Sequence, residues 1–268
     1  MKPFEVSRLR LERAKEHGAA LARIWNEIPK GSLELNVTAS VSTGNGIIEV
    51  TNSHRIPDEW PLLLGEQLYQ LRSALDACVY QAAVFSTGQN PPPLEGRREF
   101  PICSDAKEFR RQAKRRLFDL PVEIQDGIER IQPYHAPPFV IPLDPSNNIN
   151  RYLGILHELA RKDRHRKLHV VGAWPYYFTP EFVLPPGVTV HNLEIMPPGI
   201  LEAGAVLATF QLRGYIAGMD IKVNPRLRIL INCDEPPAPI DANDTFAQRL
   251  VGMINAVNSV ITAFEGYF

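Results

Sequence analysis

The clearest pattern in the chain is an apolar stripe at helical spacing between Pro57 and Gly88. Every third or fourth position there is apolar, which predicts a core helix. The stripe consists of Leu64, Leu68, Leu71, Leu75, Cys78, Val79 and Ala82. Because a free cysteine on such a face behaves as a small hydrophobe, we expect Cys78 to be buried and not to act as a nucleophile.

Several other stretches of the chain show the same helical spacing. They cover residues 4–27, 105–119, 121–131 and a segment that runs from Asn147 into a charged run at 161–167. A last amphipathic helix is predicted over about 243–265. Its N-cap is expected at Asn243 or Asp244, because short polar side chains favour that position.

Strand patterns occur before the long helix and again in the second half of the chain. Residues 32–52 predict a hairpin, because apolar residues alternate in its first half and a Gly-Asn-Gly turn follows at 44–46. A further strand is predicted from about Leu168, and then come the short β-rich stretches 188–195, 204–216 and 226–232. Helices that bracket a block of strands indicate an α+β fold in which a helical bundle packs with an antiparallel sheet.

The length of 268 residues favours one domain, residues 1–268. We expect it to have a helical sublobe over about 55–168, a β-rich sublobe over about 169–235 and the C-terminal helix. Inside the helical part, residues 89–102 include three consecutive prolines, which cannot continue a helix. This extended connector is therefore the best candidate for an internal linker.

The charges of the chain are balanced, with 29 Lys and Arg against 30 Asp and Glu. Net charge therefore predicts no general adhesion to nucleic acid or anionic membranes, and any basic site has to be local. The chain has no apolar signal segment at its start and no run of about 20 apolar residues, so we expect no membrane partner. Three scattered cysteines favour a reducing cytoplasm over a disulfide framework.

The familiar catalytic and cofactor motifs are incomplete in this sequence. His157-Glu158 begins like the helix of zinc proteases, but Arg161 stands where the second histidine ligand is needed. The sequence has no Gly-Lys-Ser/Thr phosphate loop and no Gly-x-Ser-x-Gly elbow. We therefore expect no metal and no cofactor, and an enzymatic role would have to come from other side chains.

Arg72 and Asp76 form the first polar constellation that could carry chemistry. On the predicted helix both residues border the apolar stripe and one turn separates them, so we expect them to be half-buried and able to pair. Removing an ion from water is costly unless the ion is paired. A structural ion pair and a polar site between helices both fit this pattern.

The second constellation is the charged run that follows the helix predicted from Asn147. Its candidate residues are Arg161, Asp163, Arg164, His165, Arg166 and His169. Asp163 falls on the apolar side of that helix, which favours a cationic partner, and Arg72 is one candidate. The spacing Arg164-x4-His169 combines a guanidinium that can bind phosphate with a histidine that titrates near neutrality. A solvated helix end explains the same charges.

A third cluster of cations lies on the helix predicted over 105–119. It consists of Lys107, Arg110, Arg111, Lys114, Arg115 and Arg116. A solvated surface explains this cluster. If the cluster lies beside the second constellation, the two would instead form a cationic groove suited to a polyanion such as RNA.

Four landmarks of the chain resemble a group of uncharacterised bacterial proteins. Members of that group pair a helix that reads Leu-Arg-Ser-Ala-Leu-Asp-His with a later Asp-Lys-His-Arg. The corresponding segments here are 71–76, 100–102, 131–134 and 163–166. This chain has Ala77 in place of the group's histidine and Arg164 in place of its lysine. The resemblance implies no activity.

The helical part is also remotely similar to HEPN domains, helical bundles that often act as metal-independent ribonucleases in toxin or phage-defence systems. Their motif is Arg-x4-6-His, and Arg164 and His169 match it. The β-rich region from 169 to 235 has no counterpart in a minimal HEPN bundle. The resemblance implies RNA as a partner, and it also implies a homodimer, because HEPN-type sites often form across a dimer.

The leading hypothesis is a HEPN-like core that binds RNA and could cleave it as a metal-independent endoribonuclease. Arg164 and Arg72 would hold phosphate, and His165 or His169 would act as general base or acid. Further substrate contacts would come from Asp76, Arg161, Asp163 and Arg166. The alternative is a non-catalytic binding or scaffold protein. In it, a buried structural network is formed by Arg72, Asp76, Asp163 and His165, and the sheet supplies an interaction surface.

Overall fold

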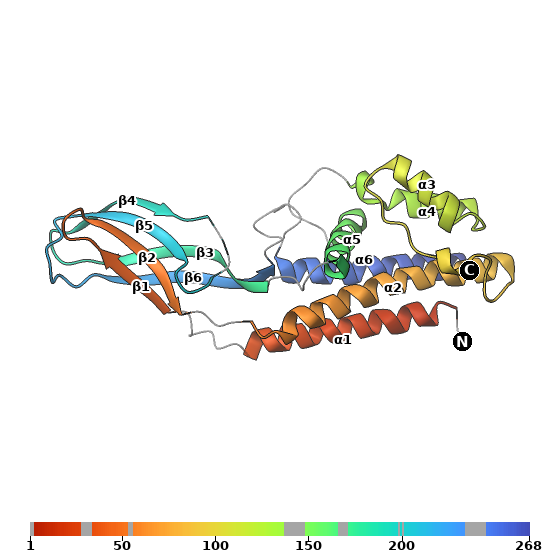
Figure 1. Cartoon of the computed structure of the whole chain (residues 1–268), viewed down its shortest axis with the longest axis horizontal. Coiled ribbons are helices and arrows are strands. Elements are labelled where there is room, and N and C mark those ends of the chain that lie inside the picture. Colours follow the sequence, from red (N-terminus) through yellow and green to blue (C-terminus); the bar gives the residue numbers. More distant parts are fainter. Residues whose placement is uncertain are drawn as a thin grey trace. The chain divides into compact units, whose positions relative to one another are not determined.

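The computed structural model has its helices and strands in separate blocks (Figure 1). It describes residues 3–27, 34–52, 56–136, 148–165, 171–197, 199, 201–233 and 245–268. Within these ranges it has six α-helices, a four-stranded antiparallel sheet and a two-stranded antiparallel sheet, so the expected α+β class is confirmed. The chain groups into unit 1, which comprises residues 1–23, 59–169 and 237–268, and unit 2, which comprises residues 24–58 and 170–236.

Unit 1 contains the helices, apart from the last residues of α1. They are α1 (Glu5–Glu27), α2 (Glu59–Thr87), α3 (Ala106–Arg116), α4 (Val122–Arg130), α5 (Ile149–His165) and α6 (Phe246–Tyr267). Each was predicted to within a few residues. The expected N-cap of α6 at Asn243 or Asp244 is wrong. Thr245 is the N-cap, because its hydroxyl and the Gln248 side chain each accept a hydrogen bond from the other residue's backbone N–H.

The long helix α2 supplies the core of unit 1. All seven residues of its predicted apolar stripe are fully buried, and α2 packs against α5 and α6. Trp60 of α2 also donates a hydrogen bond from Nε1 to the carbonyl of Leu21 in α1 at 3.1 Å. Cys78 is buried as predicted, and burial raises the pKa of its thiol to about 12. An inert thiol follows, since the thiolate is the nucleophilic form.

The connector between α2 and α3 is part of the core of unit 1 and does not link two units. Phe100, Pro101, Ile102 and Cys103 are all buried, and the boundaries of the units fall elsewhere. The expectation of an internal linker at 89–102 is therefore wrong. Its prolines do exclude a long helix, and only the short 3-10 turn Glu95–Arg97 forms there. The apolar residues that follow the prolines are what bury the segment.

Unit 2 contains all the strands that the structure describes. Its four-stranded sheet has the order β1 (Glu34–Ala39), β2 (Asn45–Asn52), β5 (Val206–Arg213) and β4 (Thr189–Ile195). The predicted hairpin is confirmed as β1 and β2, and Gly44 in its turn has a positive φ of 72°. Gly46 lies opposite Phe210 of β5, and a Cβ at this glycine would meet the phenyl ring.

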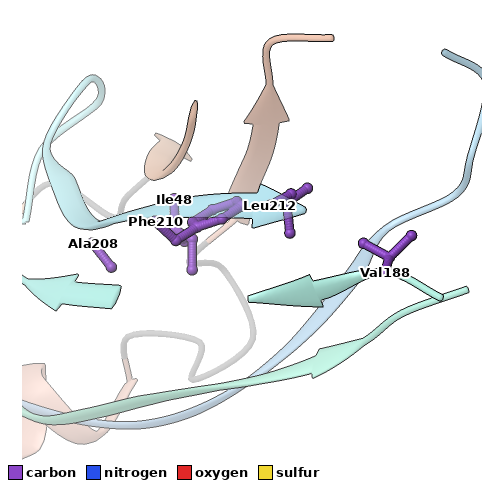
Figure 2. Packing of buried hydrophobic residues seen from close by; sticks show 5 residues of the cluster. All are labelled: Ile48, Val188, Ala208, Phe210 and Leu212. Carbon is purple, nitrogen blue, oxygen red and sulfur yellow. The ribbon is translucent and has the colours of Figure 1, made fainter. Parts of the chain in front are cut away.

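The second sheet of unit 2 covers the buried face of the first. It pairs β3 (Val171–Val183) with β6 (Lys222–Cys233). Figure 2 shows the core cluster of the four-stranded sheet, formed by Ile48, Val188, Ala208, Phe210 and Leu212. Phe182 of β3 meets the ring of Phe210 edge-on, with 5.0 Å between the ring centroids. Unit 2 is thus built from two layers of strands.

Candidate functional site

Arg72 and Asp76 bind the backbone of Phe100, which lies 28 and 24 residues further along the chain. Asp76 Oδ1 accepts a hydrogen bond from the Phe100 N–H at 2.8 Å, and Arg72 Nη2 donates one to the Phe100 carbonyl at 3.1 Å. Arg72 Nη2 and Asp76 Oδ1 lie 3.6 Å apart, which is the pairing that the sequence predicts. The two side chains therefore satisfy both polar groups of one buried peptide residue, as a neighbouring strand would.

Gln132 holds the same segment from another element. Its side chain is fully buried. Its Oε1 accepts a hydrogen bond from the Cys103 N–H at 2.8 Å, and its Nε2 donates to the Pro101 carbonyl at 3.0 Å. Three of the four landmark segments, 71–76, 100–102 and 131–134, thus meet at residues 100–103. Their polar side chains have a structural task here, because they replace a sheet partner for a buried extended chain.

Arg98 is a second arginine that binds this connector, and unlike Arg72 it is buried. Arg98 is 4% exposed. Its guanidinium donates hydrogen bonds to both carboxylate oxygens of Asp119, at 2.5 and 2.6 Å. It also donates to the carbonyls of Pro93 and Arg116 and lies 4.4 Å above the centroid of the Phe118 ring. Sequence reasoning missed this residue, because a lone arginine in an irregular segment has no periodicity from which burial can be predicted.

Asp163 lies at a cleft between α1, α2 and the end of α5. A Cβ on Gly65 would stand 2.9 Å from both carboxylate oxygens of Asp163, so glycine at this position lets the carboxylate approach α2 closely. The expected link between Asp163 and Arg72 is therefore wrong. Arg72 is seven residues further along α2, roughly 10 Å along the helix axis, and it binds Phe100.

The cleft at Asp163 contains polar residues that sequence reasoning did not select. It has a volume of about 510 Å³ and is lined by Arg13, His17, Leu62, Gly65, Glu66, Tyr69, Gln70 and Asp163. His17 Nδ1 lies 3.4 Å from Glu66 Oε2, and the His17 side chain is 9% exposed. The burial of His17 could have been predicted from the sequence. His17 lies three residues after Ala14 and four before Leu21, so it is on the same buried face of α1.

The structure describes some of the other candidate residues of the second constellation and not others. Arg161 is exposed and pairs with Glu158 on the same helix, with 2.8 Å between Nη2 and Oε1. This hydrogen bond lowers the pKa of Glu158. Arg164 and His165 belong to the last turn of α5, while Arg166 and His169 lie outside the described residues. The Arg164-x4-His169 motif therefore stays a prediction.

The helix α3 carries four cations on one exposed face, which we call the basic face. Lys107, Arg110, Arg111 and Lys114 line a hollow of about 500 Å³. Their spacing places them on one side of the helix, and Phe109 and Ala113 are its buried residues. Arg111 lies 3.7 Å from Glu108, but an exposed pair of this kind contributes little.

The basic face and the cleft at Asp163 have no lining residue in common. The single cationic groove would also need the side chains of Arg164, His165, Arg166 and His169, which lie outside the described part of the structure, so the groove stays a prediction. Among the other cations of the third cluster, Arg115 is exposed and does not line the hollow. Arg116 pairs with Glu99 at 2.7 Å. Ligand binding by the basic face would thus depend on four residues of one helix.

No protein-family model, curated protein or solved structure matches the chain. In the part of the chain that the structure describes, no group of three or more His, Cys, Asp and Glu side chains is placed to hold a metal ion. None of the described helices combines the length and apolar character needed to cross a membrane. A proposal for the function therefore rests on the geometry of the individual sites.

Proposed function

We propose that this protein binds RNA through the basic face of α3. The observation that supports this proposal is the hollow lined by Lys107, Arg110, Arg111 and Lys114. Guanidinium groups bind phosphate through two parallel hydrogen bonds, and lysine binds it as a point charge. Because the net charge of the chain is −1, attraction to a polyanion has to arise from a local patch of this kind. The remote resemblance to HEPN domains favours RNA as the polyanion.

Fluorescence anisotropy with a labelled single-stranded RNA at several KCl concentrations tests this proposal. Four phosphate contacts predict a slope of about −2.8 for log K against log salt concentration, at about −0.7 per contact. Removing two cations in the variant Lys107→Ala/Lys114→Ala should lower the slope by about 1.4. The control Lys15→Ala/Arg115→Ala removes the same charge from exposed helix positions outside the hollow, and it should bind as the wild type does.

Two outcomes would contradict RNA binding by the basic face. If both double variants lose the same affinity, binding depends on net charge and not on the hollow. If single-stranded DNA of the same sequence binds with equal affinity, the hollow is a general polyanion site and the choice of RNA is wrong.

A second proposal is that the end of α5 cleaves RNA without a metal. It rests on the cleft that His17 and Asp163 line, because Arg164 and His165 follow Asp163 directly in the sequence. An arginine can hold phosphate there, and a histidine near neutral pKa can transfer the proton. In this version Arg72 and Asp76 no longer contact substrate, because they bind the backbone of Phe100.

Labelled total RNA incubated with the protein in EDTA and read on a denaturing gel tests cleavage. We expect fragments with the wild type and with the control Arg115→Ala, since Arg115 is exposed and lines neither the cleft nor the hollow. Arg164→Ala and the double variant His165→Ala/His169→Ala should leave the RNA intact. Unchanged cleavage by both of these variants would remove the assignment. Intact RNA in every lane, together with binding in the anisotropy assay, would leave a protein that binds RNA without cleaving it.

A further inference from the structure

A cavity between α4, the start of α5 and the second half of α6 shares no residue with the basic face or with the cleft at Asp163. Its volume is about 350 Å³, and Ile124, Ile128, Ile149, Val260 and Phe264 give it apolar walls. Binding sites for small molecules typically have about 300–1,000 Å³ of space, apolar walls and a few polar groups. The cavity has the size and the lining of such a site.

Two charged side chains line this cavity, Glu123 and Arg130, and they differ in their partners. Glu123 accepts a hydrogen bond from the Tyr267 hydroxyl at 3.4 Å, which joins α4 to α6 at the cavity. Arg130 also lines the cavity, and its Nη2 lies 3.8 Å from the position of a Cβ on Gly127. Within the described part of the chain, Arg130 enters no ion pair. Its guanidinium is therefore the cationic group of this cavity that a ligand can bind.

We propose that this cavity binds a small amphipathic anion, a molecule with an aliphatic or aromatic body and one carboxylate or sulfonate group. The body would lie against the isoleucine and phenylalanine walls, where burial of apolar surface supplies affinity. The anionic group would bind Arg130, because charge-assisted hydrogen bonds to a guanidinium are strong and directional. This site is independent of RNA binding and uses none of the residues assigned to it.

Gly127 offers a way to fill the cavity without disturbing the fold. A Cβ at this position meets only Arg130, at an ordinary contact distance. Leucine is also a better helix former than glycine, so Gly127→Leu should fold at least as well as the wild type. The matched control is Gly266→Leu. Gly266 lies in α6, does not line the cavity, and has no heavy atom within 4 Å of its Cβ position.

The test is a fluorescence titration with 1-anilinonaphthalene-8-sulfonate, an aromatic anion, on full-length protein whose folding is checked by thermal melts. We expect the wild type and Gly266→Leu to bind the dye equally. Gly127→Leu should weaken binding by at least about tenfold, and Arg130→Gln should weaken it by about tenfold through loss of the charged hydrogen bond. Decanoate should displace the dye from the wild type more effectively than decanol.

Three results would overturn this proposal. Absence of dye binding by the folded wild type would show that the cavity does not take an amphipathic anion. Equal binding by wild type and Gly127→Leu would place the dye elsewhere on the protein. Equal displacement by decanoate and decanol, with no effect of Arg130→Gln, would show that the cavity selects an apolar body without the anionic group.

Discussion

Two regions of unit 1 use cations in opposite ways. In the connector before α3, Arg98 is buried and has hydrogen bonds to Asp119 and to two carbonyls. On the basic face of α3, Lys107 and Lys114 are exposed and line a hollow with two arginines. Burial and partners decide whether a cation serves the fold or can bind a ligand. Charge density in the sequence does not distinguish these roles.

The largest effect that tests this comparison is expected at Arg98. Removing one partner from a buried ion pair leaves the other charge uncompensated, so Arg98→Ala should lower the free energy of unfolding by about 3–5 kcal/mol. The control is Arg97→Ala, because Arg97 is the exposed neighbour in the same turn, and it should change stability by less than about 0.5 kcal/mol. Urea denaturation measures both. Equal, small losses would mean that Arg98 is not the anchor of the connector.

The next largest effect is a difference in stability loss between variants of the two aspartates, Asp76 and Asp163. Asp76→Ala removes a charged acceptor from the Phe100 N–H and leaves Arg72 without its carboxylate, which should cost about 2 kcal/mol. Asp163→Ala should cost less than about 0.5 kcal/mol, since Asp163 is half-buried at an open cleft. A buried network that includes both residues, as in the scaffold hypothesis, predicts similar losses, and urea denaturation distinguishes the two cases.

Sequence reasoning succeeded where the cause of structure is local. The stripe of α2 and the hairpin at 32–52 were predicted because spacing of 3.6 and 2 residues reports which face is buried. The N-cap of α6 was missed by one or two residues, since Asn243, Asp244 and Thr245 all have suitable side chains. The deciding feature was Gln248, three residues after Thr245, which completes a capping box.

Contacts between distant segments were the part that sequence reasoning could not supply. The partners of Arg72 and Asp76 lie at Phe100, and the second partner strand of β2, besides β1, is β5, more than 150 residues later. Neither periodicity nor composition encodes such pairings. The expected contact between Asp163 and Arg72 failed for the same reason, because helical phase predicts which side a residue faces and not which neighbour it meets.

A smaller effect is expected in the pH dependence of stability at Asp76. Burial disfavours its charge more than Arg72 and the Phe100 N–H favour it, so the pKa of Asp76 is raised. The folded protein then keeps this proton at pH values where the unfolded chain has lost it. The contribution of Asp76 to stability therefore falls as the pH rises above the ordinary value of about 3.9.

Asp76→Asn tests this direction, because asparagine keeps an oxygen acceptor for the Phe100 N–H and has no proton to lose. The free energy of unfolding of the variant, measured relative to the wild type, should increase between about pH 4 and about pH 7. Urea denaturation at several pH values measures it. A constant difference over this range would show that Asp76 does not carry the raised pKa.

The smallest effect on stability is expected on the basic face of α3. Lys107 and Lys114 are exposed, so Lys107→Ala/Lys114→Ala should change the free energy of unfolding by less than about 0.5 kcal/mol. The same variant should lose salt-dependent RNA affinity, which Arg98→Ala should not do at temperatures where that variant is still folded. Unchanged stability with weakened RNA binding would separate ligand-binding cations from structural ones. A stability loss approaching that of Arg98→Ala would instead make the basic face part of the fold, and the contrast between the two regions would fail.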